Sequence, residues 1–332
     1  MDISTQVSLK KWPPVLNQNQ ENNRIITFWD NKGRIKMAEK TVKYEYEYGL
    51  CKRMHYRGLW CVRYEGVPGH MEKARRQMLE RLQAVDMIVE IRDARIPMAS
   101  ANPILQEMAP NKPRLIVLSK LDIADKEACR QWETYFKTNN QRAICLDISH
   151  DNQAGRKVVR ICNELMKPWQ EKQKAKGIRP RATRAMIAGI PNCGKSTLIN
   201  KICGKNTVKA ADKPGVTKSL TWIHADPILD VLDTPGVLWP KFTDQKTGSL
   251  LAACGSINEN ILDLKFIAMD TIRSIQEYYP GVLENEFDVQ DVNPNGMLKA
   301  IAFKRNLLGN DGKLDTKRAA IVFLHEFRKA RY

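Results

Sequence analysis

Apolar and polar positions in the middle of the chain alternate between two patterns, which predicts short buried strands separated by amphipathic helices. Short apolar runs mark expected strands at 86–91, 114–118, 143–148, 185–188, 219–224 and 228–232. Helical periodicity is expected at 71–84, 125–137 and 153–166. Strands that alternate with helices at this spacing predict an α/β fold, a mostly parallel sheet with helices on both faces.

Beyond about residue 245 the strand pattern stops and only helical periodicity remains, at 261–279, 296–308 and 316–330. We therefore expect three parts. Residues 1–66 form an extension that is poorly ordered apart from a short hairpin, with a basic arm that touches RNA as the alternative. Residues 67–245 form the α/β domain, and residues 246–332 form a small all-helical domain.

The strand expected at 185–188 runs into a glycine-rich octet, Gly189 to Ser196, which spells GIPNCGKS and is followed by a helical run. This is the pattern G-x-x-x-x-G-K-[ST] between a strand and a helix, which is typical of a loop that cradles nucleoside triphosphates. Backbone amides and the helix start face the phosphates, and Lys195 reaches the β- and γ-phosphates, where it also serves catalysis. The residues expected to bind the nucleotide here are Pro191, Asn192, Cys193, Gly194, Lys195, Ser196 and Thr197.

A second motif, Asp233-Thr234-Pro235-Gly236, ends the strand expected at 228–232. Its carboxylate can hold the shell of a magnesium ion, and the Gly236 amide can bond the γ-phosphate. Ser196 offers its hydroxyl to the same ion, and Thr217 can close over it in the triphosphate state and support catalysis. The sequence therefore predicts a Mg²⁺ site made by Ser196, Thr217 and Asp233.

The base is expected to be read by Ser119-Lys120-Leu121-Asp122, which follows the strand at 114–118. The Asp122 carboxylate can accept hydrogen bonds from N1–H and the exocyclic amine of guanine, which adenine does not present. The stem of Lys120 can lie across the ring. Ser119 stands where GTPases usually have Asn, so the bridge from base loop to phosphate loop is expected to be weaker. Ser149 fits the short loop that closes on the guanine edge.

The order of these motifs is unusual, because the base-reading residues Lys120 and Ser149 precede Gly189. Ordinary GTPases place the base-reading loops after the switches, so the sequence predicts a circularly permuted G domain, which is tolerated when the original termini are close. The segment after Gly236 then leads directly into the C-terminal helices. Movement of this switch on hydrolysis is therefore expected to reach the helical domain.

The composition favours a polyanionic partner, because the formal net charge is +17 and the sequence pI is about 9.5. No apolar run is long enough to span a membrane, and no secretory or lipidation signal is visible, so membrane association is not expected. The eight cysteines are scattered without C-x-x-C spacing, which is typical of a reducing compartment.

Taken together, these motifs resemble the circularly permuted GTPases of ribosome assembly, the RbgA (YlqF) subfamily and its mitochondrial relatives. The stretches that carry the resemblance are PGHMEKARR (68–76), RDARIPMASANP (92–103), GIPNCGKSTLIN (189–200), DKPGVT (212–217) and DTPGVLWPKF (233–242). The resemblance implies a GTPase that docks on immature large ribosomal subunits and helps their late maturation. It also implies that the C-terminal helices contact ribosomal RNA, that the protein is monomeric off the ribosome, and that it works in the bacterial cytoplasm, with the mitochondrial matrix as the alternative.

The resemblance also bears on catalysis. Ras-like enzymes orient the attacking water with a Gln after the D-x-x-G motif, whereas Val237 and Leu238 stand there in this chain. The resemblance suggests His70, in a Pro-Gly-His turn, as the substitute. The alternative is that His70 caps or packs against the helix at 71–84. The resemblance further suggests that Asn192 holds a potassium ion through its side-chain oxygen.

Two other functions remain possible on the residues alone. An RNA-binding protein that uses the nucleotide only as a structural ligand would carry the same loops, and measured turnover distinguishes it from a GTPase. A membrane-associated signalling GTPase would need a lipid anchor or an amphipathic basic helix with large apolar residues, which the sequence does not show.

Overall fold

The computed structural model describes residues 76–331, except 77, 180, 206, 209–219, 237, 239–244 and 291, and two short strands nearer the N-terminus. The chain divides into two compact units, Met1–Leu50 and Cys51–Tyr332. The first unit contains β1 (Thr27–Trp29) and β2 (Ile35–Met37), which pair antiparallel. His70 and Thr217 lie outside the described residues.

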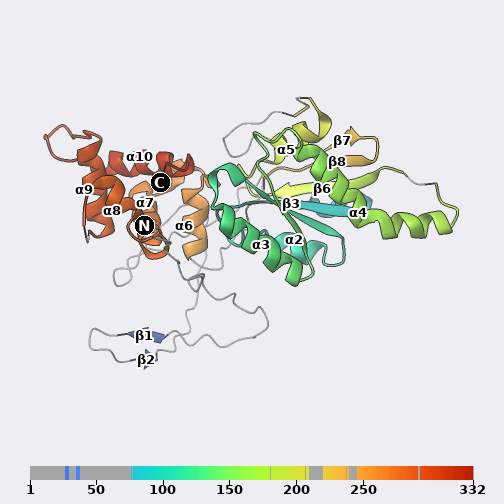
Figure 1. Cartoon of the computed structure of the whole chain (residues 1–332), viewed down its shortest axis with the longest axis horizontal. Helices are drawn as coiled ribbons and strands as arrows, with labels where there is room; N and C mark the ends of the chain where they lie inside the picture. The colour runs from blue at the N-terminus through green and yellow to red at the C-terminus, as the bar shows by residue number, and fades with distance from the viewer. Residues whose placement is uncertain are drawn as a thin grey trace, which may run out of the picture. The chain divides into compact units, whose positions relative to one another are not determined.

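A six-stranded sheet forms the centre of the second unit, in the order β5-β4-β3-β6-β8-β7 (Figure 1). Its strands are β3 (Met87–Asp93), β4 (Arg114–Ser119), β5 (Arg142–Cys145), β6 (Thr183–Gly189), β7 (Thr221–Asp226) and β8 (Leu229–Asp233). Every neighbouring pair is parallel except β7 and β8, which are antiparallel. The predicted mostly parallel α/β sheet is therefore confirmed.

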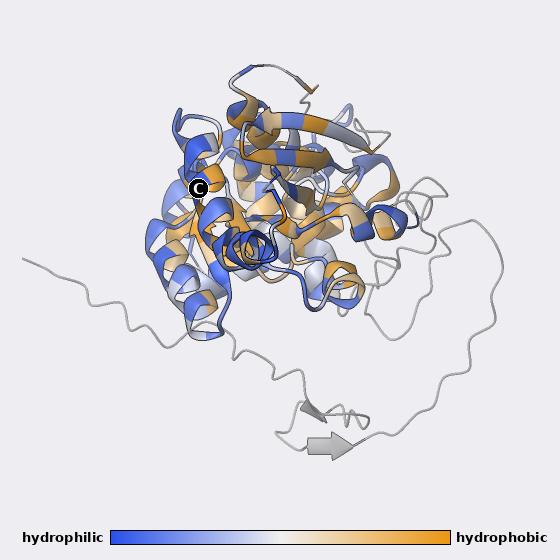
Figure 2. Ribbon diagram, turned by 90° about the vertical axis from the view of Figure 1, so that its right-hand side faces the viewer, coloured by the Kyte–Doolittle hydropathy of each residue, from blue (hydrophilic) through white to orange (hydrophobic). Residues whose placement is uncertain are grey.

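Helices cover both faces of this sheet. Helices α2 (Pro103–Met108) and α3 (Lys126–Thr138) pack on one face, and α4 (Ala154–Ala175) and α5 (Lys195–Cys203) pack on the other. All seven residues of β3 are buried, as expected of a central parallel strand covered on both sides. In Figure 2 the helices carry alternating hydrophobic and hydrophilic bands, which fits one buried face on each helix.

Helices dominate the described C-terminal residues, and apart from an isolated β-bridge between Leu308 and Leu314 they contain no strand pairing. This part comprises α6 (Gln245–Ala253), α7 (Leu264–Tyr278), α8 (Val282–Phe287), α9 (Pro294–Lys304) and α10 (Thr316–Arg328), with short 3-10 turns between some of them. Side chains of Asp263, Asn293 and Asp315 cap the starts of α7, α9 and α10. The buried cluster of these helices is continuous with the one between the sheet and helices α4 and α5.

The elements differ from the expectation in a few places. Helix α4 runs on to Ala175, nine residues past the predicted end at 166, and it contains Pro168. Its last turns are rich in Lys, Gln and Ala, which favour helix but show no apolar face that periodicity could reveal. The short helices α2, α6 and α8 were not predicted. Of the helix expected at 71–84, the described part is helical up to Arg81 and ends in a 3-10 turn, Leu82–Ala84.

A buried carboxylate, Glu90 in β3, ties the sheet to helix α2. It is fully buried and accepts two hydrogen bonds of 3.0 Å from the Arg92 guanidinium, one of 3.3 Å from Arg114, and one of 3.1 Å from the backbone N–H of Asn102. Burial alone would raise the pKa of Glu90, but Arg92 and Arg114 lower it below its ordinary value of 4.5. Glu90 is therefore ionised and fully paired.

We expect Glu90→Gln to lower the free energy of unfolding by about 3–5 kcal/mol at neutral pH, because it leaves two guanidinium groups without their buried partner. The folded-state pKa lies below the unfolded one, so Glu90 stabilises the fold above about pH 4.5 and loses this effect as the pH falls. Urea unfolding should therefore show a difference in the free energy of unfolding between wild type and variant, and this difference should become smaller in acid. Glu286→Gln, at a half-exposed ion pair with Lys304, is the control. A difference in the free energy of unfolding that does not change with pH would contradict this role of Glu90.

Candidate functional site

The predicted motifs follow strands that end at one edge of the sheet. Strand β4 ends at Ser119, β6 at Gly189 and β8 at Asp233. In parallel sheets, ligands bind at the carboxyl ends of the strands. The structure brings the base loop and the phosphate loop together there, since Ser119 and Cys193 are in contact although 74 positions separate them.

Glycine positions shape the phosphate loop. A Cβ on Gly189 would lie 2.4 Å from the carbonyl oxygen of Ile91, so no larger residue fits beside β3. Gly194 has φ of 95° and starts helix α5. A Cβ on Gly236 would lie 2.8 Å from Cα of Pro191, so the second motif touches the phosphate loop. These close backbone approaches hold the amides of the loop around the start of α5, where an anion is favoured.

The predicted catalytic lysine is folded back onto its own loop. Lys195 is 7% exposed, and its Nζ donates to the carbonyl oxygens of Ile190 at 2.8 Å and Gly189 at 3.2 Å. Its two bonded carbonyls precede the helix, so the side chain spans the loop that would hold the phosphates. To reach a phosphate, Lys195 has to exchange these two hydrogen bonds for bonds to the ligand.

Asp233 fits a hard cation. It is 3% exposed, and within the described residues its Oδ1 has no hydrogen-bond partner. Burial raises the pKa of Asp233 to about 6, although Lys195 and the Thr234 amide oppose the rise. A buried carboxylate oxygen without a partner is unfavourable unless a cation or donor meets it. Of the other predicted magnesium ligands, Ser196 is half-buried at the start of α5, and Thr217 is not described.

Lys120 in the base loop is held by Asp93, a residue that the sequence analysis did not select. The Asp93 carboxylate is 1% exposed and lies 3.0 Å from Nζ of Lys120. It also accepts two hydrogen bonds from the Arg95 guanidinium, at 2.7 and 2.9 Å, and one from the Arg95 backbone N–H at 3.1 Å. Burial alone would raise the pKa of Asp93, but the two cations hold it well below its ordinary value. The feature of the sequence that could have indicated Asp93 is an acidic residue at the end of a buried strand, β3, which lies next to β4.

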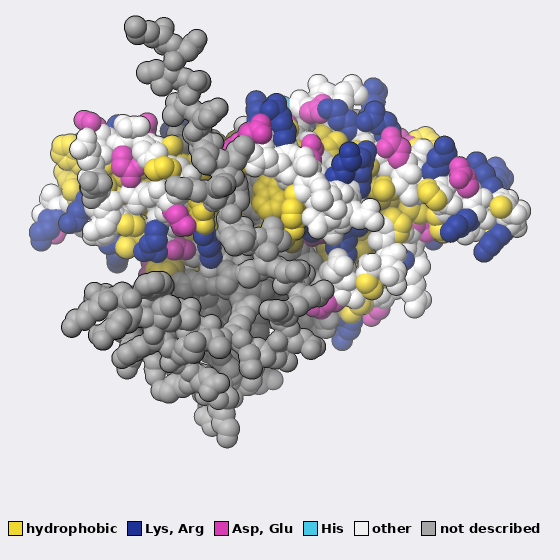
Figure 3. Space-filling view, turned by 60° about the horizontal axis from the view of Figure 1, so that its bottom comes forward, with side chains coloured by type: hydrophobic (Ala, Val, Ile, Leu, Met, Phe, Trp, Pro, Cys, Tyr) yellow, Lys and Arg dark blue, Asp and Glu magenta, His cyan; other side chains and the backbone are white. Residues whose placement is uncertain are grey.

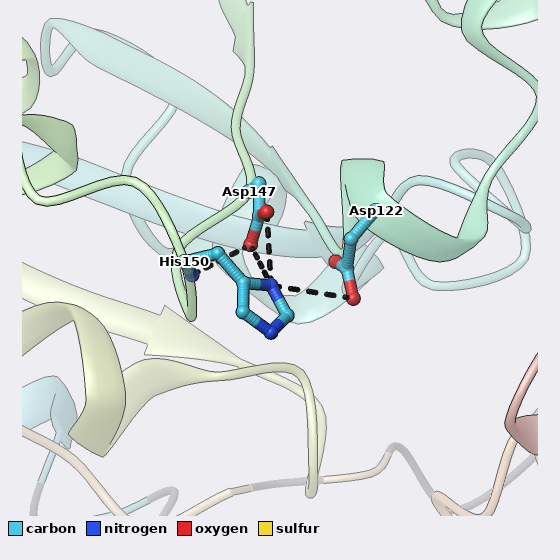
Figure 4. Close-up of side chains that lie close together, drawn as sticks. All are labelled: Asp122, Asp147 and His150. Atoms are coloured by element: carbon cyan, nitrogen blue, oxygen red, sulfur yellow. Dashed lines mark hydrogen bonds and ion pairs between the residues drawn. The ribbon is translucent and has the colours of Figure 1, made fainter.

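Asp147 and His150 join Asp122 at the far side of the base loop (Figure 4). Nδ1 of His150 lies 3.0 and 3.1 Å from the two carboxylate oxygens of Asp147 and 4.0 Å from Oδ2 of Asp122. The imidazole therefore lies beside the carboxylate that guanine would use. The exposed Ser149 immediately precedes His150, so the predicted closing loop is next to Asp122. Sequence reasoning missed Asp147 and His150, which carry no motif.

The Ser119 hydroxyl is the direct bridge between the base loop and the phosphate loop. Its Oγ lies 2.7 Å from the carbonyl oxygen of Cys193 and 2.9 Å from that of Arg92, and the residue is 1% exposed. A hydroxyl has one hydrogen, so it donates fully to only one of these carbonyls at a time. Serine in place of the usual asparagine thus keeps the hydrogen bond between the two loops, through a shorter side chain.

The phosphate loop also contacts the helical part directly. The side-chain amide of Asn192 donates to the carbonyl oxygen of Gly255, 2.7 Å away and two residues after helix α6. Arg328 of α10 in turn donates to the carbonyl oxygens of Ala252 and Ala253. The phosphate loop is therefore joined to α6 and α10 by a chain of hydrogen bonds that does not pass through residues 237–244.

Comparison with known proteins gives consistent relatives. Residues 184–300 match the sequence family described as "50S ribosome-binding GTPase". Ribosome biogenesis GTPase A of Bacillus cereus is 42% identical over 263 residues, 79% of this chain and 88% of that protein. Mitochondrial ribosome-associated GTPase 1 of Xenopus tropicalis is 32% identical over 250 residues, 73% and 76% of the two chains. The crystal structure of GNP-bound YlqF from T. maritima superposes with a TM-score of 0.56 at 25% identity, covering 78% of this chain and 94% of that one.

We expect Ser119→Ala to weaken GDP and GTP binding about fivefold, because one buried hydrogen bond between the two loops contributes about 1 kcal/mol. Titration of the purified protein with a fluorescent guanine nucleotide measures the effect. Ser274→Ala is the matched control, since it removes a serine hydrogen bond within helix α7. Unchanged affinity in Ser119→Ala would show that the bridge does not organise the site.

Proposed function

The chain belongs to the ribosome biogenesis GTPase A family, and we propose on that premise that it assists late maturation of the large ribosomal subunit, which stimulates its GTP hydrolysis. That it is a GTPase with a role in ribosome assembly follows from the family. The observation that supports the proposal best is the contact of Ser119 with Cys193, because it joins a guanine-type loop to a phosphate loop in permuted order.

The residues of the site have distinct roles in this proposal. Amides of the loop from Pro191 to Thr197, with the Gly236 amide, hold the phosphates. Lys195 leaves the carbonyls of Gly189 and Ile190 and neutralises charge on the β- and γ-phosphates. The unpartnered oxygen of Asp233, with Ser196 and Thr217, would hold Mg²⁺, and the ion would supply positive charge to the phosphates.

Guanine is read at the other end of the site. Asp122 accepts from the base, and Lys120, fixed by Asp93, lies along the ring. Ser149 and its neighbour His150 close this end. Because a carboxylate left unpaired in a closed site is costly, a base that cannot donate two hydrogen bonds is rejected.

Potassium and water are the remaining ligands of the site. The Asn192 amide nitrogen donates to Gly255, so its Oδ1 is the atom that would hold a potassium ion. His70 would orient the attacking water in place of the missing glutamine. Both roles rest on the resemblance of the motifs, and His70 requires the ribosome to bring it to the γ-phosphate.

Ribosomal RNA is the proposed partner of the helical part. The net charge of +17 favours a polyanion, and α9, α10 and the loop between them expose several cations, Lys299, Lys304, Lys313, Lys317 and Arg318. Among them Phe303 is 75% exposed and Leu308 is 56% exposed. Large exposed apolar side chains among cations suit an interface better than free solvent. We propose that the protein is monomeric off the ribosome and works in the bacterial cytoplasm, with the mitochondrial matrix as the alternative.

Membrane-spanning character was sought in the helices of the described residues. There, none of the helices combines the length and apolar character that crossing a bilayer requires.

The proposal is tested by GTP turnover of the full chain with and without purified large ribosomal subunits. We expect slow turnover alone and a clear increase with subunits. His70→Ala should keep normal nucleotide affinity and lose most of that increase, and Lys195→Ala should lose nucleotide binding. Retained binding to subunits without any hydrolysis would instead favour an RNA-binding protein that uses GTP as a structural ligand. If subunits stimulate GTP turnover of His70→Ala as much as that of the wild type, His70 has a structural role and does not orient the water.

Base selectivity is tested separately. We expect Asp122→Asn to lower GTP affinity by about 10²-fold or more and to shift preference toward xanthosine triphosphate, because the amide offers a donor where guanine needs an acceptor. Competition binding with GTP, xanthosine triphosphate and ATP measures the shift. Asp125→Asn is the control, since Asp125 is a nearby helix cap that accepts from backbone amides. Retained GTP preference in Asp122→Asn would mean that another group reads the base.

A further inference from the structure

A hollow of about 550 Å³ lies on the sheet face that also carries α2. Its lining residues are Arg81, Ala84, Arg184, Trp222, Ile223, His224 and Asp230. Arg184, Asp230 and His224 are direct partners across β6, β8 and β7, so they form one row. Trp222 lies two positions along β7 and borders the apolar core. The nucleotide site uses none of these residues.

The walls of this hollow combine an aromatic ring with cationic groups. The Arg184 guanidinium lies over the Trp222 ring, 5.5 Å from its centroid. Asp230 is engaged by Nδ1 of His224 at 2.7 Å. Among the described residues, neither Arg81 nor Arg184 forms an ion pair with a carboxylate. Within the described residues, two guanidinium groups without a carboxylate partner thus line the hollow beside a half-buried indole.

Cations continue from this hollow around the end of the sheet onto helix α4. None of the residues of α4 after Met166 is buried, so its last turns extend past the core. From 167 to 179 the chain exposes five cations and one acid, Glu171; the cations are Lys167, Lys172, Lys174, Lys176 and Arg179. Figure 3 shows Lys and Arg gathered at this end of the molecule, the right-hand end where α4 lies in Figure 1. We call residues 167–179 the α4 arm.

A second arginine–tryptophan pair links the arm to the hollow. Arg181 lies over the ring of Trp169 in α4, 5.7 Å from its centroid, and forms an ion pair with Asp86 at 2.7 Å. Asp86 also accepts from the backbone N–H of Arg184. One carboxylate therefore fixes the backbone of Arg184 and the side chain of Arg181, so that the arm and the hollow are positioned together.

We propose that this end of the G domain is a second RNA-binding surface, in which the hollow takes one unpaired nucleotide and the α4 arm contacts the neighbouring phosphates. An unstacked base has a π face that stacks on indole and guanidinium planes, and its phosphate pairs with the remaining guanidinium. The volume suits one nucleotide. The proposal rests on the RNA contact in the proposed function. It adds a site on the sheet domain, so one RNA molecule can be held at two places.

Arg184, Asp230 and His224 lie toward the starts of β6 and β8, whereas the nucleotide motifs follow the ends of these two strands. Strand β7, which carries Trp222 and His224, directly follows in sequence the segment that contains Thr217. RNA held in the hollow would therefore contact the strand that continues from the segment expected to close over magnesium.

The test measures binding of the full chain to a fluorescent single-stranded RNA and to a duplex of the same sequence. We expect Trp222→Ala to weaken single-strand binding about tenfold or more, since stacking on an aromatic side chain contributes that much per base, and to affect duplex binding little. Trp222→Phe keeps an aromatic ring and should bind nearly as wild type, which separates lost stacking from lost folding. GTP turnover without subunits should be unchanged in both variants.

The α4 arm is tested with the triple change Lys172→Ala, Lys174→Ala and Lys176→Ala. It should weaken both RNAs and reduce the slope of log affinity against log salt by about two to three, because each phosphate contact releases nearly one counterion. The matched control changes Lys126, Arg130 and Lys137 of α3 to alanine and should leave RNA binding unchanged.

The outcomes separate this inference from the proposed function. If the wild type binds RNA and subunits, and Trp222→Ala and the arm variant bind them with the same affinity as the wild type, the second surface alone is overturned. Absence of any RNA or subunit binding by the wild type would overturn the proposed function as well. Equal loss from the α3 control would show a general charge effect and would also overturn the surface.

Discussion

A buried contact between a hydroxyl and a carbonyl holds the two halves of the nucleotide site together. Ser119 ends β4, Cys193 lies in the phosphate loop, and only β3 separates their strands. The carboxyl ends of parallel strands meet at one edge, so the loops converge there whatever their order along the chain. Asp93, at the end of β3, adds the charge that fixes Lys120. The permuted order thus keeps these loops together and changes only the part of the chain to which the last of them connects.

That part is the helical domain, which shares its core with the sheet. The sequence suggested that the segment after Gly236 would carry the nucleotide state into these helices. The structure adds a shorter route, because Asn192 bonds the carbonyl of Gly255 and Arg328 of α10 holds the end of α6. A movement of the phosphate loop on a change of ligand would therefore be transmitted directly through these hydrogen bonds to α6 and α10.

The two ends of the sheet carry different chemistry. At the carboxyl ends, close backbone approaches and the buried carboxylate of Asp233 suit a triphosphate and its magnesium. On the face that carries α2, an indole and two arginine side chains, together with the α4 arm, form the surface proposed to bind RNA. With RNA bound at the proposed surface, such a separation would let the protein remain on RNA while its nucleotide is hydrolysed or exchanged.

Local patterns in the sequence predicted the strands of the sheet and the longer helices, because each of these elements depends on residues close together in the chain. They also supplied the motifs from which the phosphate loop, the base loop and the permuted order were inferred. They did not reveal Asp93, Asp147 and His150, whose roles come from neighbours on other strands. They also missed the end of α4, because its helical turns bury no apolar face. The contacts of Asn192 with Gly255 and of Trp222 with Arg184 became visible only in the folded chain. Contacts between distant segments depend on strand register and helix packing, and no local pattern encodes them.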